Sequence, residues 1–427
     1  MTKVAYLEVQ IPVRDLDARL LLGHRLTSLG FDVIIGRTSQ VFSAALINRG
    51  GIYFTDFGFT KAGAKKVKAL KERDIETFLF CEEVLAVARW DTYQVERVDS
   101  EALQLSSKVL LNNEIQKDII LDKFNRDYNF LNIGNCRFDL LEAQYRDIYA
   151  SRINKIQEKY GKFILVCTNG AVGDVENLGR RISVEGFKNA LINQEVIGVM
   201  ALQKYFIIEL LKLAKLRKDL VFVIRAKPGE EIAIKKLVPI DLENVFFDCT
   251  DNIRPWVMSA THVVSNCCST ALDAVAAGVP SITFQPKGWC EIKAEVTDFV
   301  SYETNTIEEL SKALDTIEQI KPISKIEAER YFPNLNQSTT DVLVSLLDKS
   351  TMASGSFVYS ISYATLRYWI WFLKRKYFTS HLQWTGLINF KEIIHVISKL
   401  DDIKNQRTSI KRIGAEIYLI KSKTNTE

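Results

Sequence analysis

The sequence is poor in the residues that build metal sites and disulfide frameworks. Its 427 residues include only seven cysteines and four histidines, and no two cysteines stand in a CxxC spacing, so neither a disulfide framework nor a zinc site is expected. Scattered cysteines, odd in number, are typical of buried, reduced thiols in a cytoplasmic protein. No DxD sequence follows a predicted strand and no leader precedes the first one, so we expect neither a metal-bound diphosphate nor secretion.

Charge is balanced over the whole chain but not along it. Lysine and arginine number 56 against 52 acidic residues, a formal net charge of +4. Residues 351–427 contain 12 of the basic and 5 of the acidic residues, so the rest of the chain is slightly negative. The hydrophobic content of 47% is that of a globular protein, and the length predicts at least two domains. The asymmetry sets a basic tail apart from those domains.

Short apolar runs alternate with helical patterns along most of the chain. A long helix over residues 141–160 is expected to divide the runs into two sets. The alternation predicts right-handed crossovers and parallel sheets. The runs of the first set are 3–10, 31–36, 51–55, 75–80, 107–112 and 128–134, and those of the second are 162–169, 220–230, 244–249, 261–266 and 279–284.

We therefore predict an α/β protein with two Rossmann-like domains, over residues 1–150 and 161–350, and a basic, helical tail over 351–427. Ligands of such sheets gather outside the carboxyl ends of the strands, so the two sheets are expected to face a common cleft. This is the GT-B layout, which glycosyltransferases share with some epimerases and binding proteins. The layout by itself leaves the function open.

Two acidic residues follow a predicted strand of the first domain. Glu82 and Glu83 follow the run 75–80, with Cys81 in between. One of them could accept a proton from a sugar hydroxyl while the other orients the substrate. The alternative is a pair of acids in the first turn of a helix, where the helix dipole favours negative charge.

Cations and a turn follow a strand of the second domain. Arg225 and Lys227 directly precede a turn formed by Pro228 and Gly229, and both cations could face a phosphate. The alternative is a pair of surface charges beside an ordinary turn. Thr168 and Asn169 end another strand and are predicted to lie at the same edge of the sheet.

The stretch SNCCSTALD, residues 265–273, combines a strand end with a helix start. Backbone N–H groups at a helix start can hold a phosphate, and Asn266, Ser269 and Thr270 would line that site. Asp273, one turn further on, could accept hydrogen bonds from ribose hydroxyls. The alternative is that Ser269 and Thr270 only cap the helix, with Cys267 and Cys268 as small residues that fill space.

The start of the tail, residues 356–378, is apolar, aromatic and basic. Arg367 and several Ser and Thr residues argue against a helix that spans a membrane. One interpretation is a helix that packs on the domains. The other is a helix at an anionic membrane surface, with Trp369 and Trp371 at the depth of the headgroups.

Four stretches together resemble the bacterial surface carbohydrate biosynthesis proteins, in the same order and spacing over residues 3–290. That family is related to retaining Kdo transferases of capsule and lipopolysaccharide assembly, which are GT-B enzymes that use CMP-Kdo. The resemblance implies a GT-B glycosyltransferase with a CMP-linked donor. We expect no cofactor, and no metal either if the cations and the helix start neutralise the leaving phosphate. The stretches are EVQIPVRDLDARLLLGHRLTSLGFDVIIG (8–36), IGNCRFDLL (133–141), YGKFILVCTN (160–169) and SNCCSTALDAVAAGVPSITFQP (265–286).

The resemblance also implies roles for single positions. CMP-sugar transferases of this group have an acidic pair followed by glycine in the acceptor half, which here matches Glu82 and Glu83 with Val84 in place of the glycine. A His-Pro pair meets the donor phosphate in that group, and Lys227 with Pro228 takes its place here. Lysine keeps the positive charge but cannot shuttle a proton near neutral pH as imidazole does. Asp273 stands where the family often has glutamate.

The expected function is transfer of a sugar, Kdo or a related acidic sugar, to a surface glycan. The expected partners are a nucleotide sugar, a glycan or lipid-linked glycan acceptor and an anionic membrane surface at the cytoplasmic side, and no nucleic acid. A sugar-nucleotide epimerase, which needs no acceptor, and a non-catalytic assembly partner remain alternatives. The residues predicted to bind the donor nucleotide are Thr168, Asn169, Arg225, Lys227, Pro228, Asn266, Ser269, Thr270 and Asp273.

Overall fold

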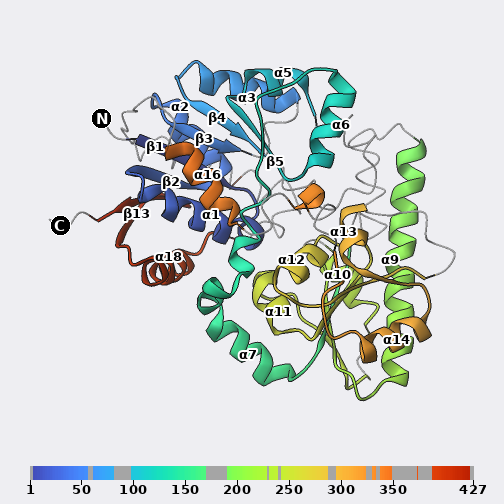
Figure 1. Cartoon of the computed structure of the whole chain (residues 1–427). Helices are drawn as coiled ribbons and strands as arrows, with labels where there is room; N and C mark the ends of the chain where they lie inside the picture. Colours follow the sequence, from blue (N-terminus) through green and yellow to red (C-terminus); the bar gives the residue numbers. More distant parts are fainter. Residues whose placement is uncertain are drawn as a thin grey trace. The chain divides into compact units, whose positions relative to one another are not determined.

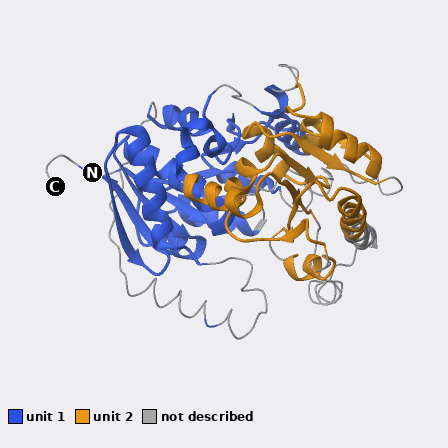
Figure 2. Cartoon of the chain, turned by 90° about the horizontal axis from the view of Figure 1, so that it is seen from below, with its two compact units in different colours: residues 1–84, 89–148, 324–427 blue, residues 85–88, 149–323 orange. Residues whose placement is uncertain are grey.

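The chain forms two compact units, shown in two colours in Figure 2. Unit 1 consists of Met1–Val84, Arg89–Ile148 and Ser324–Glu427, and unit 2 consists of Leu85–Ala88 and Tyr149–Ile323. The chain thus leaves unit 1, builds unit 2 and returns to unit 1. The computed structural model describes residues 3–55, 61–80, 98–169, 190–227, 230–238, 242–286, 295–323, 329–332, 337–348, 373 and 387–423.

Unit 1 is built on an eight-stranded sheet (Figure 1). Its strand order is β13-β14-β2-β1-β3-β4-β5-β6, and the six strands from the first part of the chain run parallel, as the sequence predicts. β14 pairs with β2 antiparallel, and β13 pairs with β14. The bounds are β1 Lys3–Val9, β2 Phe31–Arg37, β3 Ile52–Thr55, β4 Glu76–Leu79, β5 Lys108–Leu111, β6 Phe130–Asn132, β13 Thr408–Gly414 and β14 Ile417–Ser422.

Helices cover both faces of this sheet. Val4 and Tyr6 of β1 share an apolar cluster with α2 and α3, whereas Leu7, on the other face of the strand, lies beside Gly23 of α1. α1 begins with Pro12 at its first turn, where proline loses no helical hydrogen bond. α16 and α18 both pack on α1. The helix bounds are α1 Pro12–Thr27, α2 Thr38–Leu46, α3 Lys61–Lys71, α5 Ser100–Leu105, α6 Glu114–Phe124, α16 Thr339–Asp348 and α18 Phe390–Lys404.

Unit 2 is built on a six-stranded parallel sheet with the order β12-β11-β10-β7-β8-β9. α9 and α14 pack on one face of it, and α7, α11 and α12 pack on the other. The strands are β7 Ile164–Cys167, β8 Phe222–Arg225, β9 Val245–Phe247, β10 His262–Ser265, β11 Ser281–Phe284 and β12 Tyr302–Thr304. The helices are α7 Ala150–Tyr160, α9 Ala190–Leu216, α10 Glu231–Lys235, α11 Ile253–Ser259, α12 Thr270–Ala276, α13 Glu295–Val300 and α14 Ile307–Thr316.

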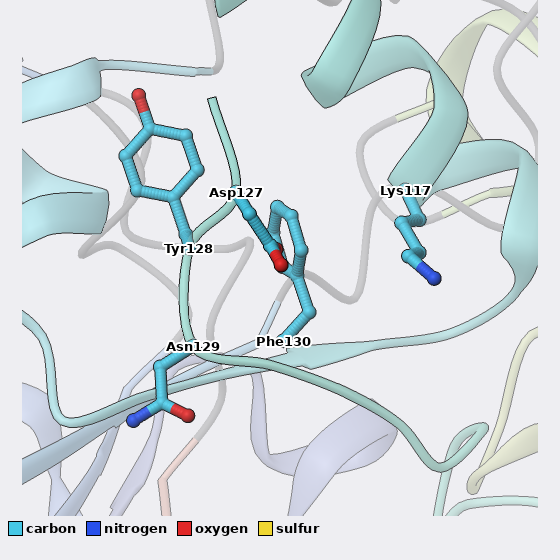
Figure 3. A pocket seen from close by; sticks show the side chains of 5 residues that line it. All are labelled: Lys117, Asp127, Tyr128, Asn129 and Phe130. Atoms are coloured by element: carbon cyan, nitrogen blue, oxygen red, sulfur yellow. The ribbon is translucent and has the colours of Figure 1, made fainter. Parts of the chain in front are cut away.

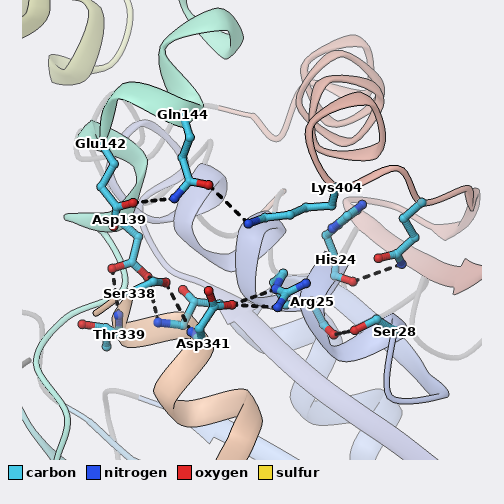
Figure 4. Close-up of polar contacts among 12 residues, drawn as sticks. His24, Arg25, Ser28, Asp139, Glu142, Gln144, Ser338, Thr339, Asp341 and Lys404 are labelled. Atoms are coloured by element: carbon cyan, nitrogen blue, oxygen red, sulfur yellow. Dashed lines mark hydrogen bonds and ion pairs between the residues drawn. The ribbon is translucent and has the colours of Figure 1, made fainter. Parts of the chain in front are cut away.

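The predicted long helix over 141–160 is wrong in its first part. Short 3-10 turns occupy Asp139–Leu141 and Ala143–Ile148, and a regular α-helix begins only at Ala150. The buried carboxylate of Asp139 accepts hydrogen bonds from the backbone N–H groups of Thr339 at 3.0 Å and Thr340 at 2.7 Å (Figure 4). Because these partners lie far along the chain, the local pattern does not reveal them.

The predicted helical tail is also wrong in part, because it contains a β-hairpin. β13 and β14 extend the sheet of unit 1, and α16, which the sequence analysis assigns to the second domain, belongs to the same unit. Side-chain contacts of α1 fasten these late elements: Arg25 pairs with Asp341 at 2.8 Å and His24 with Asp401 at 2.9 Å. The aromatic stretch 356–378 lies outside the described residues, apart from residue 373.

Within the described residues, we find no helix long and apolar enough to cross a membrane. The five cysteines in that part of the chain are free thiols, and three of them are buried: Cys136, Cys167 and Cys267.

Candidate functional site

Three loops meet at the carboxyl edge of the unit 2 sheet. β10, β7 and β8 are neighbours in the sheet and run parallel, so the residues that follow them emerge at the same edge. Thr168 and Asn169 follow β7, Lys227 follows β8, and Asn266 follows β10. The structure therefore brings together four of the residues predicted to bind the donor.

A pair of asparagines locks two of these loops together. The backbone N–H of Asn169 donates to Oδ1 of Asn266 at 3.0 Å. The Nδ2 of Asn169 donates to the carbonyl oxygen of Cys267 at 2.7 Å. Both amides thus shape the turn after β10.

That turn is strained at Cys267, whose φ of 62° lies in the left-handed region that side chains disfavour. Gln285 Nε2 donates to Cys267 Sγ at 2.7 Å and helps to hold it. This left-handed conformation turns the backbone sharply, so that α12 begins at Thr270, five residues after β10 ends at Ser265. A non-glycine residue kept in this conformation is a reason to look for a function at the turn.

The start of α12 does not have the side-chain cap that the sequence allows for. Ser269 occupies the capping position but makes no capping hydrogen bond with its side chain. The Thr270 hydroxyl instead lies 3.3 Å from Cys268 Sγ. Capping therefore does not account for Ser269.

Asp273, the residue predicted to meet a ribose, is only 1% exposed. Its carboxylate lies within unit 2, close enough to the thiols of Cys167 and Cys268 to raise the pKa of both. As the structure stands, Asp273 is a buried support of α12 and is not open to a sugar.

Lys227 presents an exposed side chain at this edge. Its backbone N–H donates to Thr168 Oγ1 at 3.1 Å, which fixes the loop after β8 on the loop after β7. Burial raises the pKa of the Cys268 thiol, while the Thr270 hydrogen bonds and the Lys227 ammonium act in the opposite direction.

Thr168 connects the loop that contains Lys227 to the interior of unit 2. It is buried, and its hydroxyl donates to Glu230 Oε2 at 2.9 Å. Gln203 of α9 donates to the same oxygen at 2.5 Å. Thr168 thus positions Lys227 and is not itself at the surface.

Arg225 has a different role from the predicted one. Its guanidinium donates to the carbonyl oxygens of Asp248 at 3.1 Å, Thr250 at 2.7 Å and Asp251 at 3.0 Å. It also stacks over Trp256, and burial lowers its pKa. These contacts explain a buried arginine without a ligand, since they hold the loop after β9, and we leave Arg225 out of the site.

Several predicted residues lie outside the described part of the chain: Glu82, Glu83, Val84 and Pro228.

The carboxyl edge of the unit 1 sheet shows polar residues that are not among the predicted ones. Glu8, at the end of β1, accepts hydrogen bonds from Thr55 Oγ1 at 2.6 Å and from the Tyr53 hydroxyl at 3.2 Å. A glutamate in an otherwise apolar strand was the available signal.

A hollow of about 440 Å³ lies at the amino end of β6, the last strand of the unit 1 sheet, and not at its carboxyl end. Figure 3 shows Lys117 across the space from the ring of Phe130, and the lining is completed by Asp127, Tyr128 and Asn129. The rings of Tyr128 and Phe130 pack edge-on, with centroids 5.8 Å apart. Because ligands of parallel sheets bind at the carboxyl ends, we do not assign this hollow to the site.

Among the residues that the structure describes, no cluster of three or more His, Cys, Asp and Glu side chains could hold a metal ion.

Comparison of the sequence with family models and with curated proteins gives no match. Solved structures do match the fold. The UDP-GlcNAc 2-epimerase of Neisseria meningitidis, bound to UDP-GlcNAc, is 15% identical and has a TM-score of 0.52, with 82% of this chain and 100% of that chain covered. The UDP-GlcNAc 2-epimerase of Methanocaldococcus jannaschii, in complex with UDP-GlcNAc and UDP, is 12% identical with a TM-score of 0.50 and the same coverage.

These similarities confirm the predicted fold class, two α/β domains of the GT-B type. At such low identity they concern the fold alone.

Proposed function

We propose that this protein is a sugar-nucleotide enzyme whose unit 2 binds the phosphates of the nucleotide at the carboxyl ends of β7, β8 and β10. The observation that carries the proposal is the exposed Lys227, whose backbone is fixed on the loop after β7. Asn169 of that loop in turn binds the strained turn at Cys267, directly before α12. A lysine ammonium and backbone N–H groups are suited to a diphosphate or phosphodiester. In the reaction they would stabilise negative charge on the leaving or retained phosphate.

The chemistry we favour is epimerisation of the sugar. The support is the fold, since the matching structures described above are UDP-GlcNAc 2-epimerases. An epimerase needs acid–base groups on both sides of one carbon and acts without an acceptor. Glu82 and Glu83 stay our predicted acid–base residues, in unit 1.

A second candidate is sugar transfer to a surface glycan from a CMP-linked donor. Its support is the resemblance of four stretches of the sequence to surface carbohydrate biosynthesis proteins. Lys227 would then meet the donor phosphate, and Glu82 or Glu83 would act on the acceptor.

The first test is a thermal-shift panel of CMP, CDP, UDP and GDP with the full chain. A ligand that binds only the folded protein raises its melting temperature. A UDP response supports the epimerase proposal, and a response to CMP alone supports transfer from a CMP-linked donor. A chain that responds to none of the four would leave the non-catalytic assembly partner as the better interpretation.

Lys227→Ala tests the site itself. Loss of one charge-assisted contact to phosphate should weaken nucleotide binding at least tenfold. Lys218→Ala removes an equally exposed lysine of the same unit and should leave the affinity unchanged. Equal affinities of the Lys227→Ala variant and the parent protein, measured by calorimetry, would remove Lys227 from the site.

The two chemistries differ in their products. Incubation with UDP-GlcNAc alone should yield an epimerised sugar nucleotide if the first candidate holds, as chromatography or NMR would detect. Release of free nucleotide that requires an added glycan acceptor would instead indicate a transferase.

A further inference from the structure

Helix α3 of unit 1 has an unusually basic sequence, KAGAKKVKALK. Residues 61–73 contain five lysines and one arginine against a single acidic residue, Glu72. Ala64, Val67 and Leu70 are buried against the sheet. Lys65, Lys68 and Lys71 are exposed and stand three residues apart, so they form a stripe along the solvent face.

The fold does not explain this stripe. Like charges at a spacing of three or four residues destabilise a helix. No ion pair with another described residue compensates Lys65, Lys68 or Lys71. The stripe is therefore a feature of the surface, and it favours an anionic partner.

More cations and an apolar side chain lie at the end of the same helix. The N–H of Gly50 donates to the carbonyl oxygen of Arg73 at 2.9 Å, and Arg49 pairs with Asp74 at 3.1 Å. These contacts bring the loop after α2 to the end of α3. Ile47, in that loop, is 42% exposed.

From this combination we propose that the exposed face of α3 binds the anionic phospholipid headgroups of a membrane surface. The binding surface consists of Lys65, Lys68 and Lys71, together with Ile47 and Arg73. A row of cations along a helix, with an exposed aliphatic side chain in the loop that meets the end of that helix, suits a lipid interface, where charge and apolar burial both contribute. A soluble polyanion would use only the charges. The surface is distinct from the nucleotide site, since none of its residues belongs to unit 2.

The proposal is tested by co-sedimentation of the full chain with vesicles of phosphatidylcholine, with and without phosphatidylglycerol. Binding should require phosphatidylglycerol and should weaken as salt is added. The triple variant Lys65→Gln, Lys68→Gln and Lys71→Gln should bind about 100-fold more weakly, at about tenfold per 1.4 kcal/mol and about 1 kcal/mol per cation.

Two matched variants separate the surface from total charge and from folding. The first is a triple variant that removes the same charge from exposed positions of unit 2, namely Lys155→Gln, Lys162→Gln and Lys218→Gln. It should bind vesicles like the parent protein. The charge-preserving variant Lys65→Arg, Lys68→Arg and Lys71→Arg should keep the binding. Equal melting temperatures of all variants show that each is folded.

Undiminished vesicle binding by the triple glutamine variant would overturn the proposal, and so would equal binding to vesicles without phosphatidylglycerol. Retention on a heparin column without any vesicle binding would also overturn it, in favour of an anionic polymer. Lys227→Ala should leave vesicle binding unchanged, so the nucleotide proposal and this one can fail separately.

Discussion

At the scale of single residues, Asp248 shows how a partly buried carboxylate holds a loop of unit 2. This carboxylate, at the end of β9, accepts hydrogen bonds from Thr250 Oγ1 at 2.6 Å, the Tyr160 hydroxyl at 2.7 Å and Lys159 Nζ at 3.1 Å. Burial by itself would raise its pKa, but these hydrogen bonds outweigh burial and lower the pKa to about 2. Arg225 binds the backbone of the same loop, so two charged residues fix it from both sides.

The lowered pKa gives unit 2 a pH dependence. Because the folded pKa lies below the ordinary value of 3.8, the ionised carboxylate stabilises the fold fully above about pH 4, and this stabilisation disappears as the pH falls to about 2. We expect Asp248→Asn to lose about 2 kcal/mol of unfolding free energy at pH 7. The unfolding free energy of the variant should also fall less between about pH 4 and pH 2 than that of the parent protein, because the variant has no carboxylate at position 248 to be protonated.

Urea unfolding at several pH values measures both effects. Asp402→Asn, a change at an exposed carboxylate of unit 1, serves as the control and should follow the parent protein. A pH profile of Asp248→Asn parallel to that of the parent would contradict the assignment.

At the scale of elements, the most consequential contact is the one between β2 and β14. Gly36 of β2 faces Ile417 of β14, and the N–H of Arg37 donates to the carbonyl oxygen of Glu416 at 3.0 Å. A Cβ at position 36 would overlap that carbonyl oxygen and would lie 2.8 Å from the Cα of Ile417. Both obstacles are backbone atoms, so the two strands would have to separate.

Gly36→Ala should therefore destabilise unit 1 by about 3 kcal/mol, as overpacking of a rigid contact does. Gly23→Ala in α1 is the matched control. An added Cβ there meets only side-chain carbons, of Val33 at 3.1 Å and Leu7 at 3.2 Å, and alanine favours the helix by about 1 kcal/mol, so this variant should lose less stability. Similar stabilities of the two variants in a thermal melt would show that β14 does not need the close approach.

At the scale of the whole molecule, unit 1 is assembled from both ends of the chain whereas unit 2 is almost continuous. Arg37 and Glu416 form a pair at 3.3 Å in which both side chains are only 7% exposed. Lys421 pairs with Asp32 at 2.6 Å. The sheet of unit 1 is therefore complete only after the last segment has been synthesised, and contacts of such long range form slowly.

A chain ending at residue 405 should keep unit 2 and damage unit 1. Without β13 and β14 the β2 edge loses its partner strand, and Arg37 loses the carboxylate of Glu416. Hydrogen exchange should rise in peptides from β1, β2 and α1. Peptides from β7 and β8 serve as the internal control, and faster exchange in them as well would contradict the independence of unit 2.

Local patterns predicted the strands well, for a reason that the burial of their residues makes clear. Runs such as 31–36 and 162–169 became β2 and β7 because a central parallel strand is covered on both faces and must be apolar throughout. The β-hairpin was not predicted because Lys411, Arg412 and Lys421 interrupt its apolar residues, which is typical of strands near a sheet edge.

The candidate site was predicted less completely. The edge that gathers Asn169, Lys227 and Asn266 follows from strand order alone, since neighbouring parallel strands end at one edge. The roles of Arg225 and Asp273 did not follow, because a charged residue next to a strand end looks the same whether it faces solvent or the interior.

By itself, then, the sequence determined the class of the fold, the two sheets and the edge at which chemistry is expected, because the spacing of apolar residues specifies which backbone segments must be buried. Only the tertiary structure decided which polar groups are buried and hydrogen-bonded inside the units and which remain at the surface. The partners of a buried charge come from distant parts of the chain, as Asp139 and Thr339 or Arg37 and Glu416 do, and no local spacing encodes them.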